Sequence, residues 1–371
     1  MSKDGYSLRQ RSKGTFEIRY QLNGKQVSTT FRADTKTEAA REGRRLARSV
    51  EDGRHSTEPR LTLADYLARW LDGARAEVRA ITWNSYRNII EHHLVPRLGK
   101  VAMSKLETGH LRQLQAQLAD DGKAPSTRRH IHRVLCTALN VAVEDKLIAR
   151  NPCDGLRRKL PKAAKKEVQT ITAEQMRRLV EETAGSRYAL AFLITVATGC
   201  RRAEVCALRW KHIDREAATV RIEQTLSMVK GELITQPTKN STPRTVKLPA
   251  TAAEALRKAY REQAEMGLRL GLRIGPESYV CADAVGKPLT PTALTDHTRR
   301  LFDRLGFTLS FHGLRHSHAT ALLLAREHPK VVQDRLGHSS AKVTLDVYSH
   351  VIDQMRDEAA DKIDAMMKGK T

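Results

Sequence analysis

His312 and Arg315 stand one helical turn apart in the segment His312-Gly-Leu-Arg-His316. Side chains three residues apart share one face of a helix, so both can reach the same phosphate group. A guanidinium fork matches two phosphate oxygens at once, and an imidazole exchanges protons near neutral pH. The pair could take part in chemistry on a phosphate group, although on its own such a pair would mean little.

Three further segments carry residues of the types that such chemistry needs. Thr198-Gly-Cys-Arg-Arg-Ala-Glu204 sets an arginine and a glutamate three residues apart, and a lysine follows Thr238. Leu336-Gly-His338 is followed, ten residues after its histidine, by a tyrosine. The residues concerned are Arg201, Glu204, Lys239, His338 and Tyr348.

Taken in chain order, these segments resemble the tyrosine recombinase (phage integrase) family. The signature of that family is Arg, Lys, His-x-x-Arg, His or Trp, and Tyr. A lone His-x-x-Arg would mean little, but here six residue types occur in family order and in their usual local contexts. The match is therefore specific, and it implies an enzyme that cuts and rejoins DNA at defined sites.

The resemblance implies that Tyr348 is the nucleophile. It would attack the scissile phosphate, form a 3′-phosphotyrosine and release a 5′-hydroxyl, with Lys239 as the general acid that protonates the leaving oxygen. A covalent intermediate of this kind keeps the energy of the broken bond for the rejoining step. We therefore expect that the reaction needs neither ATP nor a metal ion, and that the protein has no cofactor.

The remaining residues would bind the phosphate, exchange a proton or support the site. Arg201 and Arg315 would clamp the non-bridging oxygens, on which negative charge develops in the transition state. His312 would exchange a proton with the tyrosine, and His338 would donate to a non-bridging oxygen. Glu204 matches the acidic residue that supports the site in this family, so we expect it to act through its neighbours.

The fold class that follows is a multidomain, mainly α protein. The resemblance extends over nearly the whole chain, because a small sheet-plus-helix module and a basic helical bundle precede the residues of the signature. The predicted domains are 1–58 (arm-type DNA-binding sheet plus helix), 59–154 (helical core-site-binding domain), 155–168 (basic linker), 169–350 (α+β catalytic domain) and 351–371 (tail helix).

Local signals predict the elements of these domains. Asn23-Gly24 between two alternating runs indicates a hairpin, and Glu38 stands in capping-box relation to Asp34 and Thr35. In the second domain, helices are predicted to start at Thr62, Thr82, Thr108 and Pro125, the last of them running to about Ile148. In the third, Thr172 with Gln175 caps a helix, strands 219–224, 232–236 and 244–248 form one small antiparallel sheet, and helices cover 188–197, 251–267, 292–305, 312–326 and 329–337.

The charge balance predicts a polyanionic partner. The chain of 371 residues carries 65 Lys+Arg against 42 Asp+Glu, a formal charge of +23, and an excess of this size is typical of proteins that bind nucleic acid. No apolar run approaches the ~20 residues of a membrane span, so we expect a cytoplasmic, nucleoid-associated protein bound to double-stranded DNA, with no membrane contact. The predicted DNA-contacting residues are Arg9, Arg11, Arg19, Arg128, Arg129 and Arg133.

The cysteines give no metal or disulfide motif. They are scattered without a CxxC pair, which argues against a disulfide framework and a zinc ribbon. His312 and His316 stand four residues apart, as in some metal sites, but no carboxylate accompanies them, so we predict no metal. The five, which we expect to be reduced and mostly buried, are Cys136, Cys153, Cys200, Cys206 and Cys281.

Several partners and alternatives stay open at this point. The tail 351–371 has an apolar face that either caps its own core or, as is common in the family, docks on a neighbouring subunit and produces a homotetramer on DNA. A host DNA-bending protein and a directionality factor are further partners that the resemblance implies. Rival functions are a dimer-resolving recombinase of the same family, a DNA-binding regulator without catalysis, and a type IB topoisomerase.

Overall fold

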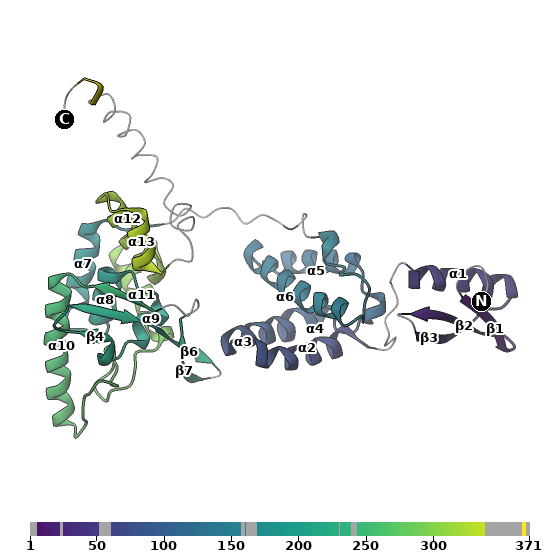
Figure 1. Ribbon diagram of the computed structural model, residues 1–371, viewed down its shortest axis with the longest axis horizontal. Helices are drawn as coiled ribbons and strands as arrows, with labels where there is room; N and C mark the ends of the chain where they lie inside the picture. The colour runs from purple at the N-terminus through teal and green to yellow at the C-terminus, as the bar shows by residue number, and fades with distance from the viewer. Residues whose placement is uncertain are drawn as a thin grey trace. The chain divides into compact units, whose positions relative to one another are not determined.

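The chain forms two compact units, Met1–Lys165 and Lys166–Thr371. The division falls inside the segment predicted as a basic linker, while the exact domain boundaries remain predictions. The computed structural model (Figure 1) describes residues 6–22, 25–51, 61–156, 160, 169–229, 231–238, 243–337 and 366–368.

The first unit begins with a three-stranded antiparallel sheet and one helix. Leu22 pairs with Lys25, so the two strands predicted on either side of Asn23-Gly24 are confirmed. Thr35 Oγ1 accepts from the Glu38 N–H at 3.1 Å and the Glu38 carboxylate accepts from the Asp34 N–H at 3.0 Å, which is the predicted cap. The elements are β1 (Tyr6–Ser12), β2 (Thr15–Leu22), β3 (Lys25–Arg32) and α1 (Lys36–Glu51).

A helical bundle with its own core follows in the same unit. The apolar stripe predicted for its longest helix is buried from Ile131 to Ala142, against leucines of the neighbouring helices. Thr62 caps the first helix of the bundle as predicted. The helices are α2 (Leu63–Glu77), α3 (Ala80–Ile89), α4 (Val95–Leu98), α5 (Thr108–Asp120) and α6 (Pro125–Glu144).

Three predicted helix ends in the bundle were wrong. α3 begins at Ala80, two residues before Thr82. α5 is capped by Glu107, because its carboxylate and the His110 ring form a reciprocal capping box, and Thr108 instead donates to the Pro152 carbonyl at 2.8 Å. α6 ends at Glu144 rather than near Ile148, because Lys146 takes a positive φ of 58° and the chain folds back.

The second unit packs helices around two small sheets. Its largest core surrounds the apolar helix α8, and the predicted helices and the Thr172–Gln175 capping box are confirmed. The elements are α7 (Ala173–Thr183), α8 (Ala189–Thr198), α9 (Arg202–Ala207), β4 (Ile213–Asp214), β5 (Thr219–Ile222), β6 (Gln224–Val229), β7 (Glu232–Pro237), β8 (Arg244–Lys247), α10 (Ala250–Arg269), α11 (Pro291–Leu305), α12 (Phe311–Leu324) and α13 (Pro329–Leu336).

The prediction of one sheet in this unit was wrong. β5 pairs with β4 and β8, whereas β7 pairs with β6, a strand that the sequence analysis missed. The ladder is interrupted at Glu223, whose carbonyl accepts from the Thr238 N–H at 3.1 Å and whose carboxylate accepts from Arg221 at 2.8 Å. An alternating pattern is continuous across such a break, so it cannot show that the chain changes its pairing partner.

The turn between α8 and α9 lies against Leu336 of α13 and His318 of α12. Gly199 occupies this turn with a positive φ of 67°. A Cβ atom built there would lie 2.5 Å from Leu336 Cδ2 and 2.9 Å from His318 Cδ2. Only glycine fits both the backbone conformation and the space, so this contact brings the start of α9 next to α12.

The contact predicts a large difference between two glycine substitutions in this unit. Gly185 also has a positive φ, 72°, but a Cβ there would meet nothing within 4 Å. Gly185→Ala should therefore cost only backbone strain, about 1–2 kcal/mol. Gly199→Ala should add overpacking of about 1–3 kcal/mol. Urea unfolding of the two variants measures the difference, and equal losses would show that the Gly199 contact is not close-packed.

Candidate active site

Arg201 and Glu204 form a cap at the start of α9. The Glu204 carboxylate accepts from the Arg201 backbone N–H at 2.9 Å and from Arg201 Nη1 at 2.8 Å. The Glu204 side chain is only 1% exposed, whereas that of Arg201 is 40% exposed. The glutamate thus holds one edge of the guanidinium and leaves part of it open to a ligand.

Arg244 is the second cation on Glu204. Its Nη1 and Nη2 donate to the two carboxylate oxygens at 3.2 and 2.6 Å, and its Nε donates to the Arg335 carbonyl at 3.0 Å. Burial alone would raise the pKa of Glu204, but the bonds from Arg244 and the charge of Arg201 outweigh it and lower that pKa to about 2. Glu204 is therefore ionised at any physiological pH.

Arg315 is buried on α12, with 1% of its surface exposed. Its Nη1 donates to the Gly199 carbonyl at 2.8 Å and its Nη2 to the Leu336 carbonyl at 2.6 Å. Among the described residues, these partners are neutral carbonyls rather than carboxylates. Burial, followed by the nearby charge of Arg201, lowers the pKa of Arg315 to about 9, so the guanidinium is still charged at neutral pH.

The cluster as a whole is electropositive. In the described part of the chain, the charges of Arg201, Arg244 and Arg315 act on one another around the single carboxylate of Glu204. Unbalanced cations that are sheltered from water attract an anion strongly, because few water dipoles screen them. Arg201 and Arg315 come from α9 and α12, and together they can clamp a phosphate.

His312 lies beside this cluster on α12, one turn before Arg315. Its ring is perpendicular to that of His316, with ring centroids 4.8 Å apart. Although part of the residue is exposed, the protein packed around the imidazole disfavours its charged form, and the charges of His316 and Arg315 add to this effect. The pKa of His312 falls to about 4, so the ring is neutral at pH 7 and able to accept a proton.

Neighbouring residues hold the site together. His318 accepts from Arg335 Nε at 3.2 Å on Nε2, and its Nδ1 lies 2.8 Å from the Val196 carbonyl. Arg335 Nη2 also donates to the Ala197 carbonyl at 2.8 Å. These bonds fasten α13 to the end of α8. Nearby, Arg209 pairs with Glu277 at 2.7 Å and Trp210 is 5% exposed, so both have structural surroundings.

Three of the predicted catalytic residues lie outside the described residues: Lys239, His338 and Tyr348. Lys239 follows the buried Thr238, directly after β7. His338 follows Gly337, the C-cap of α13, whose last carbonyls bind Arg244 and Arg315. The structure therefore brings together Arg201, Glu204, His312 and Arg315, and the roles of the six signature residues and of Glu204 remain proposals.

Two segments of the chain match domains of a known family. The phage integrase family matches residues 169–355, half of the chain. The N-terminal SAM-like domain of phage integrases matches residues 62–119. The chain belongs to the phage integrase family. It is a tyrosine-type, site-specific DNA recombinase, as the resemblance implied.

Similar proteins carry related descriptions over similar lengths. A XerC-like tyrosine recombinase of Caldanaerobacter subterraneus is 27% identical and aligns over 92% of both chains. The ICEBs1 integrase of Bacillus subtilis is 25% identical, covering 93% of this chain and 94% of its own. The integrase of Mycobacterium phage L5 is 29% identical, covering 81% of this chain and 77% of its own.

Solved structures share the fold of this recombinase. The integrase of transposon Tn1549, in complex with a circular intermediate DNA, has a TM-score of 0.68 at 21% identity, covering 81% of this chain and 99% of its own. A lambda integrase tetramer bound to a Holliday junction has a TM-score of 0.59 at 19% identity, covering 90% of this chain and 96% of its own. The mainly helical fold class, with small sheets, is thereby confirmed.

The predicted DNA-contacting arginines of the recombinase differ in their surroundings. Arg11 and Arg19 pair with the buried carboxylate of Glu17 at 2.9 and 3.2 Å, yet their side chains are 54% and 41% exposed. Arg9 is exposed and lies opposite Glu17 across the ladder. Near the start of α6, Arg128 Nε donates to Gln115 at 3.4 Å, while Arg129 and Arg133 are exposed.

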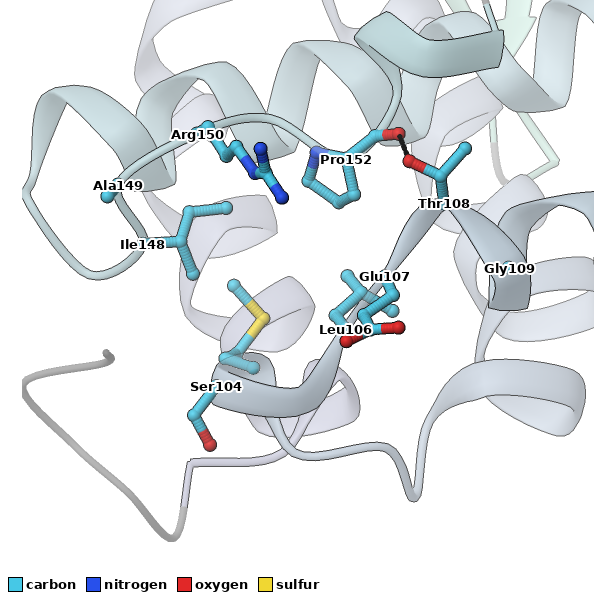
Figure 2. Close-up of a pocket in the computed structure, with 10 residues that line it drawn as sticks. Ser104, Leu106, Glu107, Thr108, Gly109, Ile148, Ala149, Arg150 and Pro152 are labelled. Atoms are coloured by element: carbon cyan, nitrogen blue, oxygen red, sulfur yellow. Dashed lines mark hydrogen bonds between the residues drawn. The ribbon is translucent and has the colours of Figure 1, made fainter. Parts of the chain in front are cut away.

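A cavity of about 260 Å³ lies elsewhere, in the helical bundle of the first unit. Figure 2 shows Arg150, Pro152, Glu107 and Thr108 around it. It contains none of the signature residues, so it is separate from the chemistry of the recombinase. Within the described residues, no helix is both long and apolar enough to cross a membrane.

Arg244 is the residue that sequence reasoning missed. It lies six residues after Thr238, and its position in the sequence indicates no role for it. The signal for it was indirect: Glu204 is a buried carboxylate, and such a group needs more than one cationic or N–H partner. The sequence cannot show which of 65 Lys and Arg residues reaches it.

We predict that Arg244→Gln impairs both the fold and the reaction of the recombinase. Removing one partner of a buried pair costs about 3–5 kcal/mol, and the resulting displacement of Arg201 should slow DNA cleavage about 100-fold. Arg221→Gln is the matched control, because Arg221 lies on the paired strand β5 and is 60% exposed. Urea unfolding and cleavage rates measure both effects; if the control loses as much, Arg244 has no special role.

Proposed function

We propose that this recombinase is an integrase that inserts or excises a mobile element through a 3′-phosphotyrosine intermediate and a Holliday junction. The observation that carries the proposal is the electropositive cluster, in which Arg201 is bonded to Glu204 and Arg315 to the Gly199 carbonyl, close enough for the charges of the two arginines to act on each other. A phosphodiester in this cluster would be gripped at its non-bridging oxygens by both guanidinium groups.

Each transfer step forms one bond to phosphorus and breaks another. The Tyr348 oxygen forms a bond to phosphorus while the bond from phosphorus to the 5′-oxygen breaks, and Lys239 protonates that leaving oxygen. His312 accepts the phenol proton, for which the neutral ring that its lowered pKa favours is suited. His338 donates to a non-bridging oxygen. In the rejoining step, the 5′-hydroxyl of a partner strand attacks phosphorus and the phenol leaves, by the reverse proton transfers.

Glu204 would act as a positioning residue in this scheme. It touches the guanidinium of Arg201 and not the phosphate, and its low pKa keeps it ionised while DNA binds. An ionised partner at 2.8 Å keeps Arg201 in one orientation before the substrate arrives. Preorganised charge of this kind costs no reorganisation during the reaction.

The predicted domains would divide the DNA contacts. Residues 1–58 would bind arm sites through one face of the sheet, on which Arg9, Arg11 and Arg19 lie; residues 59–154 would bind core sites, with Arg128, Arg129 and Arg133 at the start of α6. Two-stranded ribbons and helices are the elements that fit a major groove. The remaining proposed segments are the basic linker 155–168, the catalytic domain 169–350 and the tail helix 351–371.

Assembly is proposed from the relatives. The lambda integrase structure is a tetramer on a Holliday junction, and we propose a homotetramer on DNA for this chain, with the tail 351–371 docking on a neighbouring subunit. A host DNA-bending protein and a directionality factor would assist it in the cytoplasm, without a cofactor. Dimer resolution is the alternative function, and the sheet of residues 6–32 favours integration because resolvers usually begin at the helical bundle.

The nucleophile gives the direct test of this function. Wild type, incubated with a nicked suicide duplex carrying its crossover site, should form a covalent protein–DNA complex that survives a denaturing gel. Tyr348→Phe should form none, because phenylalanine lacks the attacking oxygen. Tyr260→Phe, which keeps the ring packed on Trp210 at 5.0 Å between centroids, should match wild type. A complex formed equally by Tyr348→Phe would refute the mechanism and favour another nucleophile.

The role of the first domain predicts a separable defect. A protein that lacks residues 1–58 should still cleave isolated core sites, because the bundle and the signature residues are intact. It should lose integrative recombination between full attachment sites, since arm-site contacts are gone. Cleavage and recombination assays on the two kinds of DNA measure these activities. If core-site cleavage were lost as well, the domain assignment would be wrong.

A further inference from the structure

Three metal-ligand side chains meet in the helical bundle of the first unit. His132 and Cys136 lie one turn apart on α6, and Cys153 lies in the turn that follows that helix. One ligand atom from each lies within 4.8 Å of the others. His132 Nε2 is 3.2 Å from Cys136 Sγ. Among the described residues, this is the one cluster with three such groups.

The backbone that carries Cys153 is fixed independently of this cluster. Asn151 Nδ2 donates to the Cys136 carbonyl at 3.0 Å and to Asn140 Oδ1 at 2.6 Å, while Asn151 Oδ1 accepts from the Cys153 N–H at 2.9 Å. The Thr108 hydroxyl donates to the Pro152 carbonyl at 2.8 Å, the dashed line in Figure 2. These bonds hold Cys153 opposite α6 in advance, so few groups need ordering when a ligand binds.

The cluster is largely buried, but one of its three residues is partly exposed to solvent. His132 is 4% exposed and Cys153 is 1% exposed, whereas Cys136 is half-buried. His132 Nδ1 is buried and has no hydrogen-bond partner among the described residues. A buried imidazole nitrogen without a partner is unusual in a folded protein, and it leaves the Nε2 contact with Cys136 as the ring's hydrogen bond among the described residues.

We propose that His132, Cys136 and Cys153 bind a zinc ion, with a water molecule at the fourth position. Two thiolates and an imidazole are the donors that zinc selects in proteins. Tetrahedral zinc, with bonds of about 2.3 Å to sulfur and about 2.0 Å to nitrogen, places its ligand atoms roughly 3.5–3.8 Å apart. The observed separations, from 3.2 Å up to 4.8 Å, reach those values by small side-chain rotations. Cys136 is only half-buried, so the fourth position would lie on the side of the cluster nearest solvent.

The histidine favours zinc over a simple pair of thiols. Two cysteines that pack together or form a disulfide need no third ligand, yet His132 contributes a nitrogen at contact distance from Cys136. Binding would displace the thiol protons to solvent and leave the net charge of the two cysteines compensated by the ion. The site lies apart from the signature residues, so this proposal does not depend on the proposed function.

Bound zinc would join α6 to the segment that leaves the bundle. Cys153 directly precedes the turn Asp154–Leu156, after which the predicted linker 155–168 continues. The ion would therefore fix the point at which the chain departs from the helical bundle. A metal that binds only the folded state also stabilises it in proportion to its affinity.

Metal analysis of the purified full-length protein tests the proposal. Wild type prepared without chelators should hold about one zinc per chain, and Cys136→Ser and Cys153→Ser should each lose most of it. Cys206→Ser is the matched control, since Cys206 is a buried cysteine of the second unit. Circular dichroism checks that each variant is folded. Zinc retained by both cluster variants, or absent from wild type after zinc is added, would overturn the proposal.

A second measurement needs no variant. Cobalt(II) added to the metal-free wild type should give the sulfur-to-cobalt charge-transfer band and the visible bands of a four-coordinate site. Zinc should then bleach these bands, and it should slow alkylation of Cys136 by iodoacetamide at least tenfold. An octahedral cobalt spectrum with unchanged alkylation, or a Cys136–Cys153 disulfide that persists with reductant and zinc present, would overturn the assignment.

Discussion

Burial of the Glu204 carboxylate is the constraint on which the site depends. Removing a carboxylate from water costs several kcal/mol, and only well-placed partners offset that cost. Arg201 and Arg244 supply them, at 2.8 and 2.6 Å. Because Arg244 belongs to β8 and also donates to the Arg335 carbonyl, one buried charge fixes the start of α9 relative to β8 and to the end of α13. Neutralising it would loosen all three elements together.

The same region keeps an excess of positive charge, which lowers the stability of the fold but suits an anionic ligand. Arg315 is buried against carbonyl oxygens, and its lowered pKa records how unfavourable that environment is for a cation. In the proposed reaction, a bound phosphate would offset the repulsion between Arg315 and Arg201. His312, which those charges help to keep neutral, would gain affinity for a proton once the phosphate is bound.

The first unit applies the same electrostatic rules at its surface. Glu17 is buried within β2 and holds Arg11 and Arg19 by salt bridges, yet about half of each arginine side chain remains exposed. Such pairs add little to stability when one partner is exposed, but they order long side chains before DNA arrives. In the same unit, the hydrogen bonds of the Asn151 side chain order the backbone at Cys153 in a similar way.

The family resemblance supplied the mainly helical fold class and the signature residues, whose roles remain proposals. Local patterns predicted the helix caps at Thr62 and Thr172, the capping role of Glu38 and the buried stripe of α6. Each of these depends on spacing within a short window, which the covalent chain fixes. The tertiary structure decided that Arg244 reaches Glu204, that β7 pairs with β6, that Thr108 bonds to Pro152, and that Cys153 meets His132. Except for the hairpin of β6 and β7, these contacts join residues well separated in the chain. The partner of a buried polar group is chosen by packing and desolvation across the whole fold.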